Sequence, residues 1–319
     1  MGSLQRYFWP KTVLLFFTHG DVIEAGFGLF SKKEGLRIEE RRQIPVDEKK
    51  ELIEWYRDIA RTYPKTFVAG MVDTTNQGAL PGCGHKVFQR FDVEYALVNS
   101  LCIDGKWSVY LSSVELTWFE QRYKGMIFDF LFSPFVLLHE ALGRHGEGEG
   151  ETVCAVLHRR GQAFVGIFTE GALRFADVLV VSEGHGAIEE ESGEEVTDLA
   201  FDLDMLEEDE VAPISDVDVL GDFKEGDEEL AAAEGDDAVL EMLEYNLEFF
   251  DALKASIEKF YRDERYASDF VQKVILFDLE ETGDDFVRFV EDELFMEGVV
   301  YRADPLATMA ALVEKSGEI

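Results

Sequence analysis

The last third of the chain alternates amphipathic helices with short apolar strands, and this order constrains the fold more than any other feature. Residues 239–261 repeat apolar side chains at helical spacing, and residues 274–277 read Val-Ile-Leu-Phe, which predicts a buried strand. A second helix is predicted over 284–295 and a short strand over 299–301, before a corner at 303–306. Helices that alternate with strands are typical of an α/β fold.

The start of the chain predicts a second, different run of elements. Strands are expected over 12–18, 22–31 and 36–44, because each is apolar or alternating and is bounded by Gly or Pro. A helix over 47–63 and a strand over 67–72 follow. This β-β-β-α-β order is similar to the opening of a ribonuclease-H-like half.

The middle of the chain predicts a small inserted subdomain and then another meander of strands. We expect an α+β subdomain over about 85–145, followed by a Gly- and Glu-rich boundary at 146–150. Beyond it, residues 152–158 and 162–169 form a predicted hairpin, and 172–181 a further strand.

Together these patterns resemble the actin-like (ASKHA) superfamily, and especially the branch of the type IV pilus assembly protein PilM and the cytoplasmic domain of the type II secretion protein GspL. The resemblance rests on the helix–strand–helix–strand order and on the Ala-Asp-Pro-Leu corner at 303–306. It implies two actin-like halves, residues 1–146 and 151–319. The first would carry the subdomain at 85–145, and the second an acidic insertion at about 183–238.

ATP-binding members of that superfamily hold phosphate on two turns. Each turn needs an Asp and a Gly-containing loop, because backbone amides bind the phosphates while the carboxylate positions Mg²⁺ through water. Here the matching turns read Phe-Thr-His-Gly-Asp at 17–21 and Leu-His-Arg-Arg-Gly at 157–161. The first lacks the required residue order, and the second has no acid. The degenerate loop positions are His19, Gly20, Asp21, Arg159, Arg160 and Gly161.

The third loop also lacks the residues that ATP-binding members of the superfamily carry there. In ATP-binding members, glycines after the strand let the backbone approach the adenosine. Residues 278–283 read Asp-Leu-Glu-Glu-Thr-Gly, so three carboxylates, beginning with Asp278, stand where an anion would have to approach.

Loss of all three loops predicts a protein that is not an enzyme, because phosphoryl transfer depends on metal and donors placed around phosphate. We expect no cofactor and no metal site. Cys83 and His85 lack a second ligand pair at zinc spacing, and Asp198, Asp202 and Asp204 lack the Gly and Glu of a calcium loop. An ATP-binding kinase or ATPase whose loops are aligned differently is the alternative.

The charge is concentrated in one segment. The chain carries a net charge of −36, and residues 183–241 hold 24 acidic residues and one lysine, which leaves −13 for the rest. Such a charge argues against nucleic acid and anionic membrane as partners. Apolar residues within the acidic segment are candidate partner-binding residues, because a segment that folds on binding must bury something. They are Phe201, Leu203, Leu206, Val217 and Leu220.

Three widely spaced cysteines predict no disulfide framework and suit a reducing compartment, and no apolar run is long enough to span a membrane. We therefore expect a cytoplasmic protein, and the resemblance implies that it reaches the inner membrane through a partner. The resemblance implies an adaptor or scaffold that binds the short cytoplasmic tail of an inner-membrane protein, in a pilus or secretion machine. An acidic interaction scaffold unrelated to pili is a second alternative.

Overall fold

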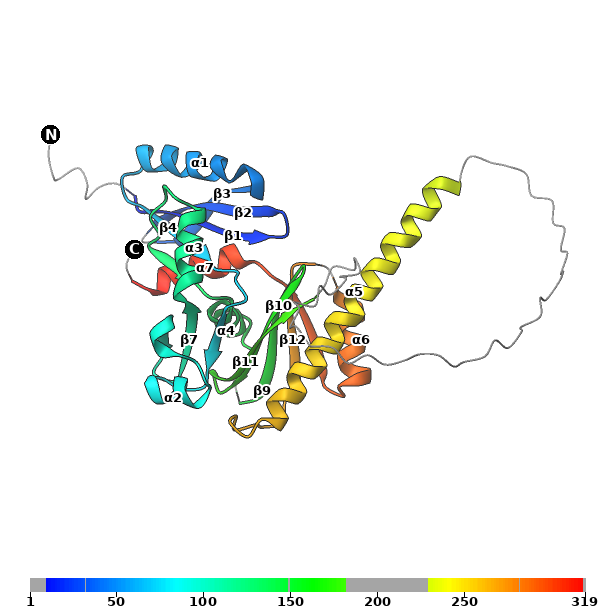
Figure 1. The fold of residues 1–319 in the computed structure, drawn as a ribbon. Coiled ribbons are helices and arrows are strands. Elements are labelled where there is room, and N and C mark those ends of the chain that lie inside the picture. Colours follow the sequence, from blue (N-terminus) through cyan, green and yellow to red (C-terminus); the bar gives the residue numbers. More distant parts are fainter. Residues whose placement is uncertain (1–9, 32, 149, 182–228, 281, 318–319) are drawn as a thin grey trace, which may run out of the picture. The chain divides into compact units, whose positions relative to one another are not determined.

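A computed structural model describes residues 10–31, 33–148, 150–181, 229–280 and 282–317 (Figure 1). Residues 1–183 and 245–319 form one compact unit, and the fold below is that of its described part. The candidate partner-binding residues between 201 and 220, and the three aspartates at 198–204, lie outside the described residues.

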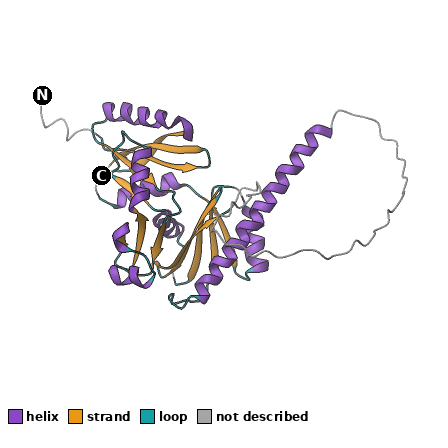
Figure 2. Cartoon of the chain, viewed as in Figure 1, coloured by secondary structure: helices purple, strands orange, loops and turns teal. Residues whose placement is uncertain are grey.

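Five strands make the first sheet, as the sequence predicts for four of them. They are β1 (Thr12–His19), β2 (Val22–Ser31), β3 (Gly35–Pro45), β4 (Thr66–Met71) and β8 (Phe130–Phe132). Their order is β3-β2-β1-β4-β8. Figure 2 shows the strands in orange and the helices in purple. The first three strands form an antiparallel meander, whereas β4 is parallel to β1 and β8 is parallel to β4.

The second sheet repeats this plan. Its strands are β9 (Thr152–Arg159), β10 (Gln162–Thr169), β11 (Ala172–Val180), β12 (Lys273–Asp278) and β13 (Glu297–Arg302). Their order is β11-β10-β9-β12-β13, again an antiparallel meander followed by two parallel strands. The strands predicted at the start of the chain and those predicted after residue 150 therefore lie in two separate sheets. The same topology twice in one chain is the actin-like arrangement of two halves.

Helices cover the outer face of each sheet. Helix α1 (Lys49–Thr62) packs Leu52, Trp55 and Ile59 onto the first sheet, residues whose spacing places them on one helical face. On the second sheet, the described part of α5 (Glu229–Arg262) and helix α6 (Gly283–Glu293) bury aromatic and aliphatic side chains in a separate core. That core includes Phe249, Leu253, Phe260 and Phe286.

Two further helices join the halves. Helices α4 (Pro134–His145) and α7 (Pro305–Lys315) share one apolar core with the inner faces of both sheets. The predicted corner at 303–306 is the start of α7, where Asp304 caps the helix by accepting the Ala307 N–H and Pro305 occupies the first turn. The common core fixes the two halves against each other, and so positions the turns at their junction.

A third, smaller sheet lies in the region predicted to be inserted. Strands β5 (Gln77–Leu80), β6 (Val98–Ile103) and β7 (Trp107–Ser112) form it in the order β5-β7-β6, next to the short helix α2 (His85–Arg90). Helix α3 (Ser113–Arg122) follows β7. The small sheet thus begins before residue 85, and β8 belongs to the first sheet because its backbone pairs with β4. The domain boundaries themselves stay a prediction.

The expectation that the cysteines do not pair is wrong, because Cys83 and Cys102 form a disulfide. The small sheet brings them together: Cys102 on β6 lies opposite Ser108 on β7, and Ser108 lies opposite Leu80 at the end of β5, just before Cys83. Spacing along the chain gives no sign of this. The disulfide also removes the argument for a reducing compartment. Cys154 is free and buried. Among the described helices, none is long and apolar enough to cross a membrane.

Candidate functional site: the junction of three turns

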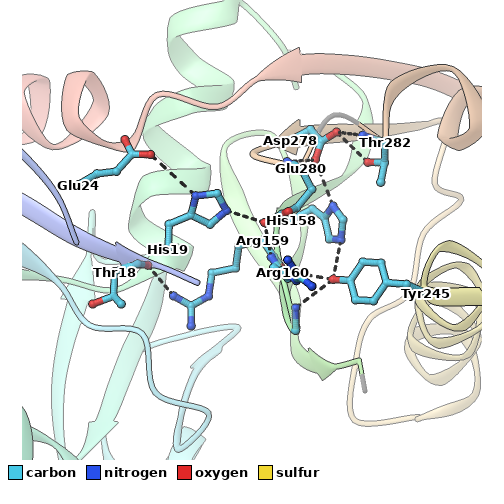
Figure 3. A network of polar contacts seen from close by, with 11 residues as sticks. Thr18, His19, Glu24, His158, Arg159, Arg160, Tyr245, Asp278, Glu280 and Thr282 are labelled. Atoms are coloured by element: carbon cyan, nitrogen blue, oxygen red, sulfur yellow. Dashed lines mark hydrogen bonds and ion pairs between the residues drawn. The ribbon is translucent and has the colours of Figure 1, made fainter. Parts of the chain in front are cut away.

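The three turns that the sequence marks as degenerate phosphate and adenosine loops meet at one place (Figure 3). They are the turn between β1 and β2, the turn between β9 and β10, and the loop after β12. Side chains and backbone groups of all three bind one another directly. We call this place the junction.

One carboxylate oxygen connects all three turns. The Oε1 atom of Glu280 lies 2.5 Å from Nε2 of His19 and accepts the backbone N–H of Arg160 at 2.6 Å. On its other side the His19 ring faces Glu24 of β2, with 3.8 Å between Nδ1 and Oε1. His19 therefore lies between two carboxylates, of which Glu280 is the hydrogen-bonded one.

The charges at this contact reinforce one another. Glu24 and Glu280 raise the pKa of His19 from 6.5 to about 9, against the opposing effect of burial. Burial raises the pKa of the Glu280 carboxyl, but hydrogen bonds from His19 and from the Arg160 N–H outweigh it, so the net shift is downward. At neutral pH the contact is therefore an imidazolium bound to a carboxylate.

Arg159 makes the second connection between the halves. Its guanidinium donates from Nη1 to the carbonyl of Thr18 at 2.8 Å and lies 3.3 Å from the Asp73 carboxylate just after β4. From Nη2 it donates to Oε1 of Gln162 at 2.8 Å. Two donors remain without an acceptor among the described residues: Nε of Arg159 and Nε2 of Gln162, a residue only 5% exposed.

A buried histidine organises the second half of the junction. His158 has no exposed surface, and its Nδ1 lies 3.1 Å from Oδ1 of Asp278, while the ring stacks on Phe249 at 4.2 Å between centroids. In the tautomer that donates from Nδ1 to the carboxylate, Nε2 is free to accept the hydroxyl proton of Tyr245, 3.2 Å away. The Tyr245 oxygen also accepts the Gly161 N–H at 3.1 Å.

Asp278 holds the loop after β12 in shape. Besides His158, its carboxylate accepts the backbone N–H of Glu280 and both the N–H and the hydroxyl of Thr282. Burial raises the pKa of Asp278, but the hydrogen bonds from His158, Glu280 and Thr282 outweigh burial and lower it. Asp278 is thus an ionised structural acceptor whose oxygens are already bound.

The structure brings most of the residues singled out from the sequence to this junction, although what they bind stays a prediction. His19, Arg159, Arg160 and Asp278 make the contacts above. Gly161 contributes its N–H, and Gly20 forms the turn with a left-handed φ of +55°. The side chain of Asp21 is exposed and makes none of these contacts.

Sequence reasoning missed the residues that complete the junction. These are Asp73, His158, Gln162, Tyr245 and Glu280. One signal was available for His158: it and Asp278 end neighbouring parallel strands and stand directly opposite in register. A His and an Asp at the carboxyl ends of two adjacent strands indicate a pair.

Next to the junction is an open cavity of about 270 Å³. It lies between the loop after β4, including Asp73, and the face of α3 that carries Glu115, Trp118 and Arg122. Among the described residues no group of three or more His, Cys, Asp or Glu side chains is arranged to hold a metal ion.

Two family models match the chain. One, described as Domain of unknown function (DUF8569), covers residues 28–139, and the other, Domain of unknown function (DUF8341), covers residues 154–318. The chain belongs to the DUF8341 family. No curated protein matches it.

Solved structures show a common fold at low sequence identity. The PilM–PilN type IV pilus biogenesis complex matches over 93% of this chain and 89% of that one, with 11% identity and a TM-score of 0.55. A Bacteroides thetaiotaomicron protein with an actin-like ATPase fold and unknown function matches over 97% and 99%, with 8% identity and a TM-score of 0.48. The ethanolamine utilization protein EutJ of Carboxydothermus hydrogenoformans matches over 96% and 89%, with 10% identity and a TM-score of 0.42. The fold is actin-like, and PilM is among its structural neighbours.

Proposed function

We propose that this protein is a non-catalytic adaptor of an inner-membrane assembly, such as a type IV pilus or type II secretion-like machine. In this role it binds the short cytoplasmic tail of a membrane partner. It works from the cytoplasmic side and carries no nucleotide.

One observation carries the non-catalytic part of the proposal: the chain's own side chains occupy the junction. Donors suited to phosphate, the Arg160 N–H and the His19 imidazolium, are bound to Glu280. The Arg159 guanidinium is bound to Thr18 and Asp73, and both Asp278 oxygens are engaged within the protein. An ATP phosphate would have to displace Glu280 and approach several carboxylates, which like-charge repulsion opposes.

The adaptor part is supported by the fold and by one surface. PilM, the neighbour with the matching fold, was solved in complex with PilN. In this chain, β6 ends the small sheet and leaves one strand edge unpaired among the described residues. Strand β6 reads Val-Asn-Ser-Leu-Cys-Ile and has no charged residue, whereas β3, an edge strand of the first sheet, carries five. Natural edge strands that must stay free are usually protected by charge.

Exposed apolar side chains flank this edge. Leu101 of β6 is 62% exposed and Trp118 of α3 is 60% exposed. Asn99, on the same face of β6 as Leu101, donates to the Ser113 hydroxyl at the start of α3, so strand and helix border each other. An extended tail adding to β6 would find main-chain hydrogen bonds there and apolar contacts on alternate residues. Because the protein is strongly acidic, we expect a basic tail.

The nucleotide question has a direct test. A ligand at 100 times its Kd adds about 2.7 kcal/mol to the unfolding free energy. We expect Mg-ATP to give no such stabilisation in a thermal shift assay. A Mg-ATP-dependent stabilisation that Gly20→Val abolishes would instead identify an ATP-binding enzyme.

The tail-binding surface is tested with the partner itself. Crosslinking in native membranes followed by mass spectrometry should identify a single-span protein, and calorimetry should show that a synthetic peptide of its tail binds the purified chain. Leu101→Asp should weaken the binding about tenfold or more, because it replaces an exposed apolar side chain of β6 with a charged one. The matched control is Phe295→Asp, at an exposed aromatic residue on the second half. Equal affinity of both variants would remove β6 from the proposal.

The acidic insertion is a separate part of the proposal. We infer that residues 183–241, with a net charge of −23, contribute to partner binding through their apolar residues. Deletion of 186–232 should slow association and reduce its salt dependence. If the deletion leaves the association rate and its salt dependence unchanged, the insertion has no part in recognition.

A further inference from the structure

The Cys83–Cys102 disulfide lies where a thiol in solution can reach it. Cys102 is exposed on the edge strand β6, whereas Cys83 is partly buried in the loop after β5. Exposed disulfides are the labile or regulatory ones, whereas structural disulfides resist reduction by cellular thiols. In the cytoplasm, where the proposed function places this chain, disulfides of mesophilic proteins are usually transient and serve in catalysis or redox sensing. Exposure and location both indicate a bond that is made and broken.

The fold can also hold the reduced form. Cys83 lies between Gly82 and Gly84, whose φ angles are +129° and +88°, and glycines leave the backbone of this loop free to change conformation. The Sγ atom of Cys83 is 3.3 Å from the carbonyl oxygen of Trp107. A thiol at this position therefore has an acceptor for its weak S–H donor. Opening the bond needs a local adjustment of one loop and no rearrangement of the large sheets.

The middle of β6 depends on this bond for its position. The strand pairs with β7, and its residues 99–102 are all exposed. Its end residues, Val98 and Ile103, pack against apolar cores, and Asn99 donates to the Ser113 hydroxyl. The disulfide adds a covalent link between β6 and the loop after β5. A strand edge that is already ordered binds an extended segment more tightly, because no binding free energy is lost in ordering it.

We propose that Cys83 and Cys102 form a thiol–disulfide switch that orders β6 when they are bonded and loosens it when they are reduced. The co-reactant is a small cellular thiol. Its thiolate attacks the exposed Sγ of Cys102, the S–S bond breaks, and Cys83 leaves as a thiolate. A second thiolate attacks the outer sulfur of this mixed disulfide and releases Cys102, so the reagent ends as its own disulfide. The protein gains two electrons, and its two thiolates take up the two protons that the reagent lost.

The switch also acts on the tail-binding surface, and this consequence rests on the proposed function. The oxidised chain presents an ordered β6 edge, with Leu101 exposed on it. In the reduced chain the tail must order the strand as it binds, so we expect its affinity to fall about tenfold or more.

The first test asks whether the bond opens at cellular thiol levels. The purified chain is equilibrated with millimolar reduced glutathione, labelled with N-ethylmaleimide without denaturant, and analysed by mass spectrometry. Cys83 and Cys102 should both take the label, and oxidised glutathione added before the label should prevent this. Cys154 is buried and should stay unlabelled, which shows that the chain remains folded. A bond that stays intact under these conditions would overturn the proposal, because it would be a structural disulfide.

The second test measures the order of β6 by proteolysis. Lys106 lies in the turn between β6 and β7, and Lys33 lies in the turn between β2 and β3; both are exposed. Trypsin cleavage after each lysine reports the opening of one hairpin. Reduction should speed cleavage at Lys106 about tenfold or more and leave Lys33 unchanged, because the bond holds β6 alone. The double variant Cys83→Ser/Cys102→Ser should be cleaved quickly at Lys106 in either buffer.

Equal cleavage at Lys106 in oxidised and reduced wild type would overturn the proposal, since the bond would then not order β6. Calorimetry with the tail peptide separates the switch from the adaptor role. Tighter binding to oxidised than to reduced wild type, with no difference between the buffers for the double variant, supports both. Equal affinity in the two states would contradict control of tail binding by the switch. A peptide that binds neither state counts against the adaptor role alone, because labelling and cleavage at Lys106 still decide the switch.

Discussion

Asp278 accepts more hydrogen bonds than any other side chain at the junction. Its two oxygens accept from the His158 ring, from the Glu280 N–H and from both donors of Thr282. His158 is fully buried, so without the carboxylate its ring nitrogen would lack an acceptor in a place that water does not reach. Removing the acceptor of a buried hydrogen-bond donor is expensive because the donor stays behind unsatisfied.

We therefore expect Asp278→Ala to lower the unfolding free energy by about 2–4 kcal/mol. Urea denaturation followed by circular dichroism measures this. Asp269→Ala is the matched control, since Asp269 is an exposed aspartate whose carboxylate accepts the Phe270 N–H. A similar small loss in both variants would mean that the His158–Asp278 pair contributes little.

His19 should make stability depend on pH. Its pKa is raised to about 9 by Glu24 on β2 and Glu280 after β12. The ion pairs contribute fully below the unfolded pKa of 6.5, and their contribution falls as the pH rises and is lost above about 9. We expect a loss of the order of 1–3 kcal/mol across this window. Urea titrations at pH 6 to 10 measure it, and His19→Gln should flatten the curve over the same window.

At the scale of elements, the small sheet depends on a cross-link. The Cys83–Cys102 disulfide closes a loop of 19 residues in sequence separation and ties the end of β5 to the edge strand β6. Chain-entropy arguments give about 3 kcal/mol for a loop of this size. The rest of the small sheet is held by a core of few residues around Phe88 and Phe91.

Reduction, or Cys102→Ser, should therefore lower stability by about 2–3 kcal/mol and loosen β6 first. Hydrogen exchange measured by mass spectrometry should show faster exchange in β6 and β7, with the two large sheets little changed. Cys154 is an internal reference: burial raises its pKa to about 12, so its thiol should resist alkylation in the native protein. Equal loosening of all three sheets would show that the small sheet does not open alone.

The sequence predicts elements better than it predicts which elements touch. Apolar runs such as 12–18 and 274–277 set the strands of both sheets, because burial on both faces leaves a continuous signal. The three degenerate turns could be found because a resemblance says which turns should meet. The Cys83–Cys102 bond and the Glu280 contact could not, since each depends on residues that only the folded sheet places side by side.

At the scale of the whole molecule, charge is the dominant property. The net charge is −36, and self-repulsion of that size opposes a compact state at low ionic strength. Most of it lies in residues 183–241, whereas the rest of the chain carries −13. Added salt should therefore reduce self-repulsion more in residues 183–241 than in the rest of the chain.

We expect the unfolding free energy of the full chain to rise when salt is raised from about 50 to 500 mM, because the Debye length shortens from over 10 Å to below 5 Å. Deletion of 186–232 should reduce this slope. Thermal unfolding at several salt concentrations measures both proteins. A salt-induced loss of stability, or identical slopes, would show that self-repulsion does not limit the stability of this protein.

The junction also has a kinetic consequence for its turns. Amide protons in turns usually exchange with solvent within seconds, because nothing holds them. At the junction, the amides of Arg160, Gly161, Glu280 and Thr282 are all bound to side chains: Glu280, Tyr245 and Asp278. Each amide proton can exchange only when its hydrogen bond to one of these side chains breaks. The four amide protons should therefore exchange slowly. They should also exchange at the same rate, because one cooperative opening of the junction exposes all of them.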